Sequence, residues 1–257
     1  MNNPNIQPQP GEPPQGYPPP QSILVKPPSV RPLITYTMMA ACIIIYLLQI
    51  ASGFVFAGDL PAALGAKLNE WILRGELWRL FTPMFLHGSI IHIAFNMYAL
   101  YNLGPALERF YGHKRYLALY VLSGFAGNVI SFMFSPNPSL GSSTAIFGLL
   151  GAEGVFLYQN RELFGSNARR GFSQVISIAV INLLIGMTPG IDNWGHIGGL
   201  IGGTLFAWFA GPQLRLEGIF PTFTFMDKRA SREVLVAGWG VGGLFVLLTA
   251  AVFLMRI

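Results

Sequence analysis

The chain has 257 residues, of which 52% are hydrophobic and only 11% are charged, and its formal net charge is +5. Soluble globular domains carry roughly 25% charged residues, so this composition excludes an ordinary soluble domain and indicates a membrane protein. The single cysteine, Cys42, lies in an apolar run, which excludes a disulfide framework and a cysteine-based zinc site.

The first 32 residues differ from the rest of the chain, because they hold most of its 19 prolines and almost no aliphatic bulk. Such a composition favours extended polyproline conformations and cannot bury a core. A signal peptide would need a basic start and an early apolar run, and neither is present. We therefore expect residues 1–32 to form a disordered, proline-rich cytoplasmic tail.

After this tail, seven stretches have the length and apolar character of a membrane-spanning helix, which needs about 20 residues. They are residues 33–56, 88–107, 116–135, 142–159, 171–188, 193–211 and 234–255. We expect an all-α polytopic membrane protein with a six-helix core over 33–211, a cytoplasmic linker at 212–233 and an extra C-terminal transmembrane helix at 234–257.

The distribution of lysine and arginine predicts the orientation, because cytoplasmic loops are enriched in these residues. With the tail inside, four of the 16 basic residues lie in outer segments, namely Lys67, Arg74, Arg79 and Arg256, and the other twelve lie in inner ones. The amino terminus is therefore predicted to be cytoplasmic. The positive charge is explained by this topology, so no nucleic-acid partner is expected.

In this topology the second, fourth and sixth spans all run from outside to inside, so their amino-terminal ends lie at one depth near the outer face. Polar side chains gather at these three ends, in the stretches HGSIIHIAFNM from His87, GSSTAIFG from Gly141 and DNWGHIGG from Asp192. Polar groups inside a membrane are costly and usually mark function. A channel or transporter would instead distribute them through the depth or show inverted repeats.

The residue types in this layer suit hydrolysis. Serine and histidine on neighbouring helices can act as nucleophile and general base. His92 and Asn96 share one helix face at i, i+4 spacing, where they could donate hydrogen bonds to an oxyanion together with a backbone N–H of the fourth span. The residues alone leave Ser139, Ser142 and Ser143 open as the nucleophile.

Glycines recur at three- and four-residue spacing in two of these spans, and such spacing lets helix backbones touch. They are Gly148, Gly151 and Gly154 in the fourth span, and Gly195, Gly198, Gly199, Gly202 and Gly203 in the sixth. If these faces meet, a serine at the start of one helix can reach a histidine at the start of the other.

With these motifs in order, the sequence resembles the rhomboid family of intramembrane serine proteases over roughly residues 33–211. The resemblance rests on Trp78-Arg79, on HxxxxHxxxN (His87, His92, Asn96), on Glu108 before Tyr111-Gly112, on Gly141 to Gly151 and on NWGHIGG from Asn193 to Gly199. Their order, spacing and topology agree with the family, and the seventh span fits its form with one extra C-terminal helix.

The resemblance implies Ser143 as the nucleophile and His196 as general base and acid. It also implies an oxyanion site made by His92, Asn96 and the Ser143 N–H. Because the family works with a Ser–His dyad, Asp192 is interpreted as a helix cap or an outer-loop acid.

A second set of motif residues is expected to support the site or the fold without taking part in the chemistry: His87, Trp78, Arg79, Glu108, Gly141, Asn193 and Gly199. One position departs from the family pattern, since Thr144 follows the nucleophile where relatives often carry glycine. This departure bears on how closely a substrate backbone can approach.

The sequence therefore predicts a serine endopeptidase that cleaves transmembrane protein substrates in or near their membrane segments, with no metal and no cofactor. By resemblance, it prefers small side chains before the cut and helix-weak sequence after it. We expect a bacterial cytoplasmic membrane as its location, with the active site opening to the outer face. The alternative is a catalytically silent rhomboid-like protein that binds membrane-protein clients. The oligomeric state is not predicted.

Overall fold

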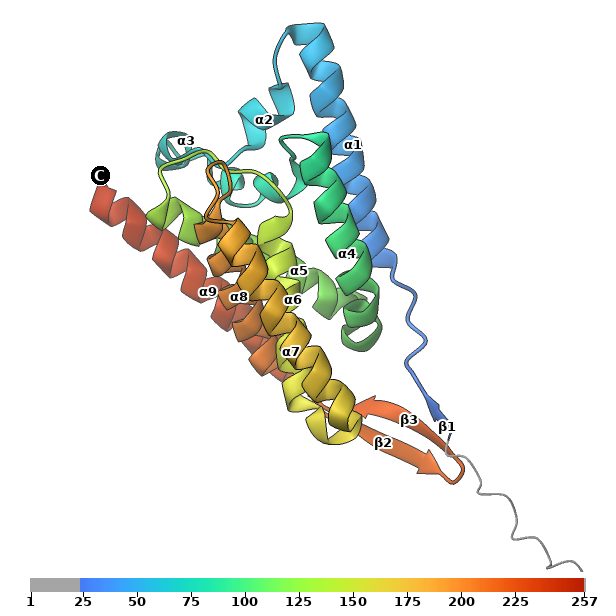
Figure 1. Ribbon diagram of the computed structural model, residues 1–257. Coiled ribbons are helices and arrows are strands. Elements are labelled where there is room, and N and C mark those ends of the chain that lie inside the picture. The colour runs from blue at the N-terminus through green and yellow to red at the C-terminus, as the bar shows by residue number, and fades with distance from the viewer. Residues whose placement is uncertain (1–23, 257) are drawn as a thin grey trace, which may run out of the picture.

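The computed structural model describes residues 24–256, and within them a bundle of seven long helices forms the body of the molecule (Figure 1). Four of these helices, α1, α5, α7 and α9, are long and apolar enough to cross a membrane. A mostly helical chain with candidate membrane-spanning helices is thus confirmed, while the number of spans stays a prediction. The seven are α1 (Leu33–Phe56), α4 (Ile90–Tyr111), α5 (His113–Phe134), α6 (Ser143–Gln159), α7 (Arg161–Ile185), α8 (Asn193–Ala210) and α9 (Ser231–Arg256).

The polar stretch between the first two long helices folds into short elements at one end of the bundle, at the top of Figure 1. They are α2 (Leu60–Gly65), α3 (Asn69–Leu73) and the 3-10 turns η1 (Leu77–Leu80) and η2 (Thr82–Phe85). Helix α2 is capped by Asp59, whose carboxylate accepts a hydrogen bond from the Ala62 N–H at 2.9 Å. This is the usual way to satisfy a free N–H in a first turn.

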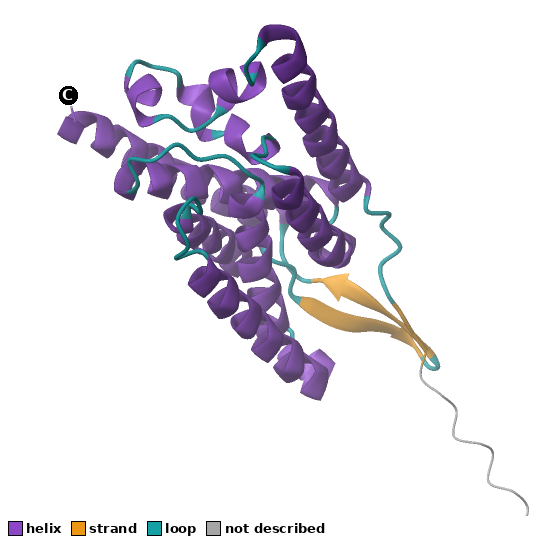
Figure 2. Cartoon of the chain, turned by 45° about the horizontal axis from the view of Figure 1, so that its top comes forward, coloured by secondary structure: helices purple, strands orange, loops and turns teal. Residues whose placement is uncertain are grey.

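A small sheet lies at the opposite end of the bundle (Figure 2). Strands β2 (Leu214–Ile219) and β3 (Thr222–Asp227) form an antiparallel hairpin, and β1 (Leu24–Lys26) pairs parallel to β3. The predicted linker at 212–233 is therefore a hairpin followed by the start of α9. The alternation of threonine and phenylalanine in TFTF, typical of a strand, explains the difference. Of the predicted tail, residues 1–23 lie outside the described residues, and Leu24–Lys26 is a strand.

Helix α6 lies at the centre of the bundle, since most of its residues are buried between α5, α7 and α8. Its contact with α8 is made by backbone. A Cβ added to Gly203 would lie 2.2 Å from the Gly148 carbonyl oxygen, and one added to Gly199 would lie 1.9 Å from that of Thr144. The predicted meeting of the two glycine-bearing faces is confirmed.

Glu108 joins α4 to the start of α1, as expected for a structural residue. Its carboxylate is fully buried and accepts hydrogen bonds from the N–H groups of Ile34 and Thr35, both at 2.8 Å, and from the Thr35 hydroxyl at 2.7 Å. Free N–H groups and the positive end of the helix dipole both favour a carboxylate there.

Candidate active site

Ser143 and His196 meet at the ends of two adjacent helices. Ser143 is the first residue of α6, and His196 lies in the first turn of α8. The His196 Nε2 and Ser143 Oγ atoms are 2.9 Å apart and hydrogen-bonded. The histidine is buried while the serine is partly exposed. A nucleophile within hydrogen-bond reach of a base, with an accessible hydroxyl, has the geometry that covalent catalysis needs.

Asp192 caps the helix that carries His196. Its Oδ1 atom accepts a hydrogen bond from the Gly195 N–H at 3.0 Å, and its carbonyl oxygen accepts one from the His196 N–H at 3.1 Å. The expected capping role is confirmed. The other carboxylate oxygen accepts a hydrogen bond from the Ser131 hydroxyl, so both oxygens are bound away from the imidazole. Within the described residues, the His196 Nδ1 atom has no hydrogen-bond partner.

Phe147 holds the imidazole from one side. Its ring stacks on that of His196 with centroids 4.3 Å apart and an angle of 11° between the planes. The sequence analysis did not identify this residue. Its position one turn after Ser143 was the available signal, because residues four apart lie on one helix face.

His92 lies on α4 beside the serine, and Asn96 lies one turn further along the same helix. A Cβ added to Gly141 would lie 2.7 Å from His92 Nε2 and 3.6 Å from Ser143 Oγ, so the imidazole and the hydroxyl border the same small space. Gly141 has a φ of 134°, which favours glycine. Asn96 is buried, and its Nδ2 atom has no hydrogen-bond partner in the described part of the chain. The Asn96 amide is therefore a buried hydrogen-bond donor without an acceptor among the described residues.

Of the three serines considered from the sequence, Ser143 is the one bonded to His196. The Ser142 hydroxyl instead lies 3.3 Å from Nε2 of His87. The Ser139 backbone pairs with that of Lys67, with N···O distances of 2.9 and 3.1 Å.

Comparison with known proteins identifies the family. The rhomboid domain model matches residues 74–213, a range that includes His92, Ser143 and His196. The chain belongs to the rhomboid family. Rhomboid protease GluP of Bacillus subtilis (strain 168) is 42% identical over 84% of this chain and 40% of its own length.

Two plant relatives differ in that only one of them is named as inactive. RHOMBOID-like protein 9, chloroplastic, of Arabidopsis thaliana is 39% identical over 62% of this chain and 37% of its own length. Inactive RHOMBOID-like protein 8 from the same plant is 37% identical over 49% of this chain and 36% of its own length. This rhomboid therefore spans about two fifths of the length of the curated relatives it matches.

In this rhomboid His87 is fixed by the first long helix. The Gln49 side chain accepts from the His87 N–H at 3.0 Å and donates to its carbonyl oxygen at 3.1 Å. The His87 ring packs edge-on against that of His92, with centroids 5.2 Å apart. Gln49, a polar residue within an apolar span, was a signal that the sequence analysis did not use. His87 thus links the first long helix to His92 at the site.

The motif pair Trp78-Arg79 supports the loop between α1 and α4. The Trp78 indole donates to the Leu64 carbonyl at 3.0 Å. The buried Arg79 guanidinium donates to the carbonyls of Ala66 at 2.9 Å and Ala63 at 2.8 Å. Neither residue contributes a group to the Ser143–His196 pair, so the structure places both in loop support.

Asn193 and Gly199 hold α8 in place. The Asn193 side chain donates to the Leu183 carbonyl near the end of α7 at 3.1 Å. Gly199 has no side chain, so the backbone of Thr144 packs directly against it.

Thr144 packs against α5 and α8. It is buried, and a Cβ added to Gly127 of α5 would lie 2.6 Å from the Thr144 Cβ, while one added to Gly195 of α8 would lie 3.0 Å from its Cγ2. The side chain therefore fills the junction of α5 and α8.

A buried lysine completes the surroundings of the site. The Lys67 ammonium group is fully buried and donates to the Ser131 hydroxyl and to the Ser135 carbonyl, both at 3.0 Å. Ser131 in turn donates to Asp192. Burial lowers the pKa of Lys67 from 10.5 to about 8, against the opposing attraction of Asp192. The loop between α1 and α4 is thereby linked to Asp192, which caps the helix that carries His196.

Proposed function

We propose that this chain is an intramembrane serine endopeptidase that hydrolyses peptide bonds in or near transmembrane segments of other membrane proteins. The observation that carries the proposal is the 2.9 Å hydrogen bond between His196 and Ser143. Membership of a family with a named protease relative supports it. No step in the proposed reaction needs a metal or a cofactor.

In the proposed reaction Ser143 Oγ attacks the substrate carbonyl carbon while His196 Nε2 accepts the hydroxyl proton. Collapse of the tetrahedral intermediate breaks the C–N bond, and His196 returns the proton to the leaving amine. Water then attacks the acyl-enzyme with the same histidine as base. Because the Asp192 carboxylate is bound to Gly195 and Ser131, we assign a dyad and not a triad.

The oxyanion of the intermediate would be stabilised from two helices. Ser143 is the first residue of α6, so its N–H has no partner within the helix and lies at the positive end of the dipole. Asn96 offers a buried amide without an acceptor, and His92 borders the same space. Donors that are already fixed in place cost no reorganisation when charge develops.

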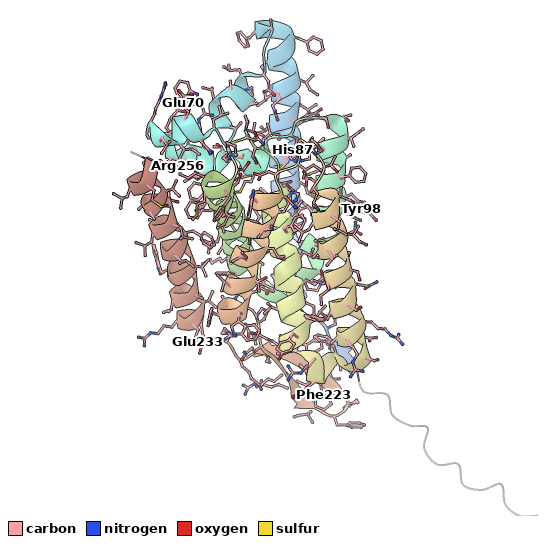
Figure 3. All side chains as sticks on the ribbon, turned by 60° about the vertical axis from the view of Figure 1, so that its left-hand side comes forward. Glu70, His87, Tyr98, Phe223, Glu233 and Arg256 are labelled. Carbon is pink, nitrogen blue, oxygen red and sulfur yellow. The ribbon has the colours of Figure 1, made fainter. Side chains whose placement is uncertain are left out.

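We further propose that all seven long helices span the membrane, with the amino terminus cytoplasmic and the site open to the outer face. Figure 3 supports a common end for the site and the outer segments, since His87 lies in the same half as Glu70 and Arg256. Phe223 of the sheet and Glu233 lie at the other end. A bacterial cytoplasmic membrane fits this arrangement.

The test is cleavage of a tagged transmembrane substrate by the purified, reconstituted protein. Wild type is compared with Ser143→Ala, His196→Ala and the matched control Ser142→Ala, which removes a neighbouring hydroxyl bonded to His87 instead. We expect cleavage to be lost in the first two variants and retained in the third. Cleavage that survives Ser143→Ala would remove this serine as the nucleophile.

A rhomboid that binds clients without cleaving them is the second candidate, and the inactive plant relative is the observation that favours it. The same experiment separates the two. If folded wild type cleaves none of several transmembrane substrates and its Ser143 does not react with a fluorophosphonate, the binding role is supported and the protease assignment is wrong.

A further inference from the structure

A groove of about 550 Å³ lies between α8 and α9, away from the dyad. Its walls are hydrocarbon, with Leu205 and Phe209 from α8 and Val236 and Leu244 from α9. Gly240 of α9 also lines the groove and leaves it open, because a Cβ added there would meet nothing within 4 Å. A groove with such walls in a bilayer is filled by hydrocarbon, because apolar walls without neighbours forfeit their dispersion contacts.

One end of the groove is basic. Arg229 and Arg232 line it, and Glu233 beside them lies at the sheet end of the molecule in Figure 3. Arg229 donates to the carbonyls of Gly211 and Trp208, each at 3.2 Å, so its guanidinium is fixed in position. Arg232 is exposed and has no ion pair among the described residues.

The acidic groups near this end already have partners. Glu233 pairs with Arg229 at 3.4 Å, and Asp227 pairs with Arg115 at 2.8 Å. Lys228 and Arg232 therefore add positive charge that the protein leaves uncompensated. Basic pockets between transmembrane helices on the cytoplasmic side are typical binding sites for anionic lipid headgroups, and the predicted topology places this end on that side.

We propose that the groove binds one anionic phospholipid, with an acyl chain along the apolar walls and the phosphate at Arg232 and Arg229. A lipid fits better than a helix of another protein. The apolar walls suit an acyl chain, and Lys228 and Arg232 at one end, unpaired among the described residues, suit an anionic headgroup. The proposal does not depend on protease activity.

The test is native mass spectrometry of the purified full chain, released from micelles that contain equal amounts of phosphatidylglycerol and phosphatidylcholine. We expect wild type to retain one phosphatidylglycerol with at least a fivefold preference. Gly240→Leu should fill the groove and reduce retention at least fivefold. Since the added side chain meets open space and leucine favours helix over glycine, this variant should fold.

Two matched controls keep the result specific. Gly243→Leu adds the same side chain to α9, also into open space, but Gly243 does not line the groove. Arg170→Gln removes an exposed arginine of α7, whereas Arg232→Gln removes the one at the groove. We expect Arg232→Gln alone of this pair to abolish the preference for phosphatidylglycerol. Equal retention by wild type and Gly240→Leu, or equal loss in both glycine variants, would overturn the proposal.

Discussion

Replacing Lys67 with methionine should change how the stability of the protein depends on pH. The lysine is fully buried, and its pKa is lowered from 10.5 to about 8 because burial disfavours the charged form. Asp192 opposes this shift and Arg256 reinforces it. Methionine keeps most of the apolar stem and removes the proton that titrates.

The sign follows from proton binding in the two states. Between pH 8 and pH 10.5 the unfolded chain keeps a proton on Lys67 that the folded protein has released. The unfolding free energy of wild type therefore rises with pH in this window. One proton contributes about 1.4 kcal/mol per pH unit, so roughly 3 kcal/mol accumulates across the interval.

The measurement is the unfolding free energy of the purified protein in mixed micelles, by denaturant titration at pH 7, 8.5 and 9.5. The unfolding free energy of wild type minus that of Lys67→Met should increase by about 1.4 kcal/mol per pH unit above pH 8. Contributions from groups that both proteins share cancel in this difference. The exposed Lys228→Met serves as the matched control and should show no such difference. If the unfolding free energies of wild type and Lys67→Met change with pH in parallel, the lowered pKa of Lys67 is refuted.

Three further substitutions test other contacts. Gly203→Leu should lower the unfolding free energy by about 3 kcal/mol or prevent folding, because its Cβ would lie 2.2 Å from the Gly148 carbonyl oxygen; thermal unfolding measures this. Gly141→Ala, at a φ of 134° and against a histidine ring, should reduce kcat at least tenfold in the cleavage assay while the protein stays folded. Glu108→Gln should cost about 1–3 kcal/mol of stability through weakened bonds to α1, whereas the exposed Glu70→Gln should cost nothing measurable.

The polar layer was predictable from the sequence because membrane topology limits where side chains can lie. Once the spans and their direction are assigned, the starts of three alternate helices must share one face of the membrane. His92, Ser143 and His196 do lie together in the structure. The meeting of α6 with α8 was predictable for a similar reason, since glycine spacing leaves few other ways to pack two helices.

The contacts that orient these residues were not predictable in the same way. The stacking of Phe147 on His196 and the link from Lys67 to Asp192 join positions far apart in the chain. Nothing in the sequence around Lys67 distinguishes a solvent-exposed lysine from a buried one. The strand β1 is a further example, because Leu24–Lys26 pairs with β3 across nearly the whole sequence.

The hydrogen-bonded pair of Ser143 and His196 is held by two kinds of contact that respond differently to change. The spacing of α6 and α8 is set by backbone against backbone at Gly199 and Gly203, where no flexible side chain can absorb an added atom. The direction of the imidazole is set by Phe147 and by the Asp192 cap. Substitutions at the glycines should therefore lower stability and activity together. Substitutions around the imidazole should lower kcat while much of the stability remains, so measuring both quantities distinguishes loss of the bundle from loss of the chemistry.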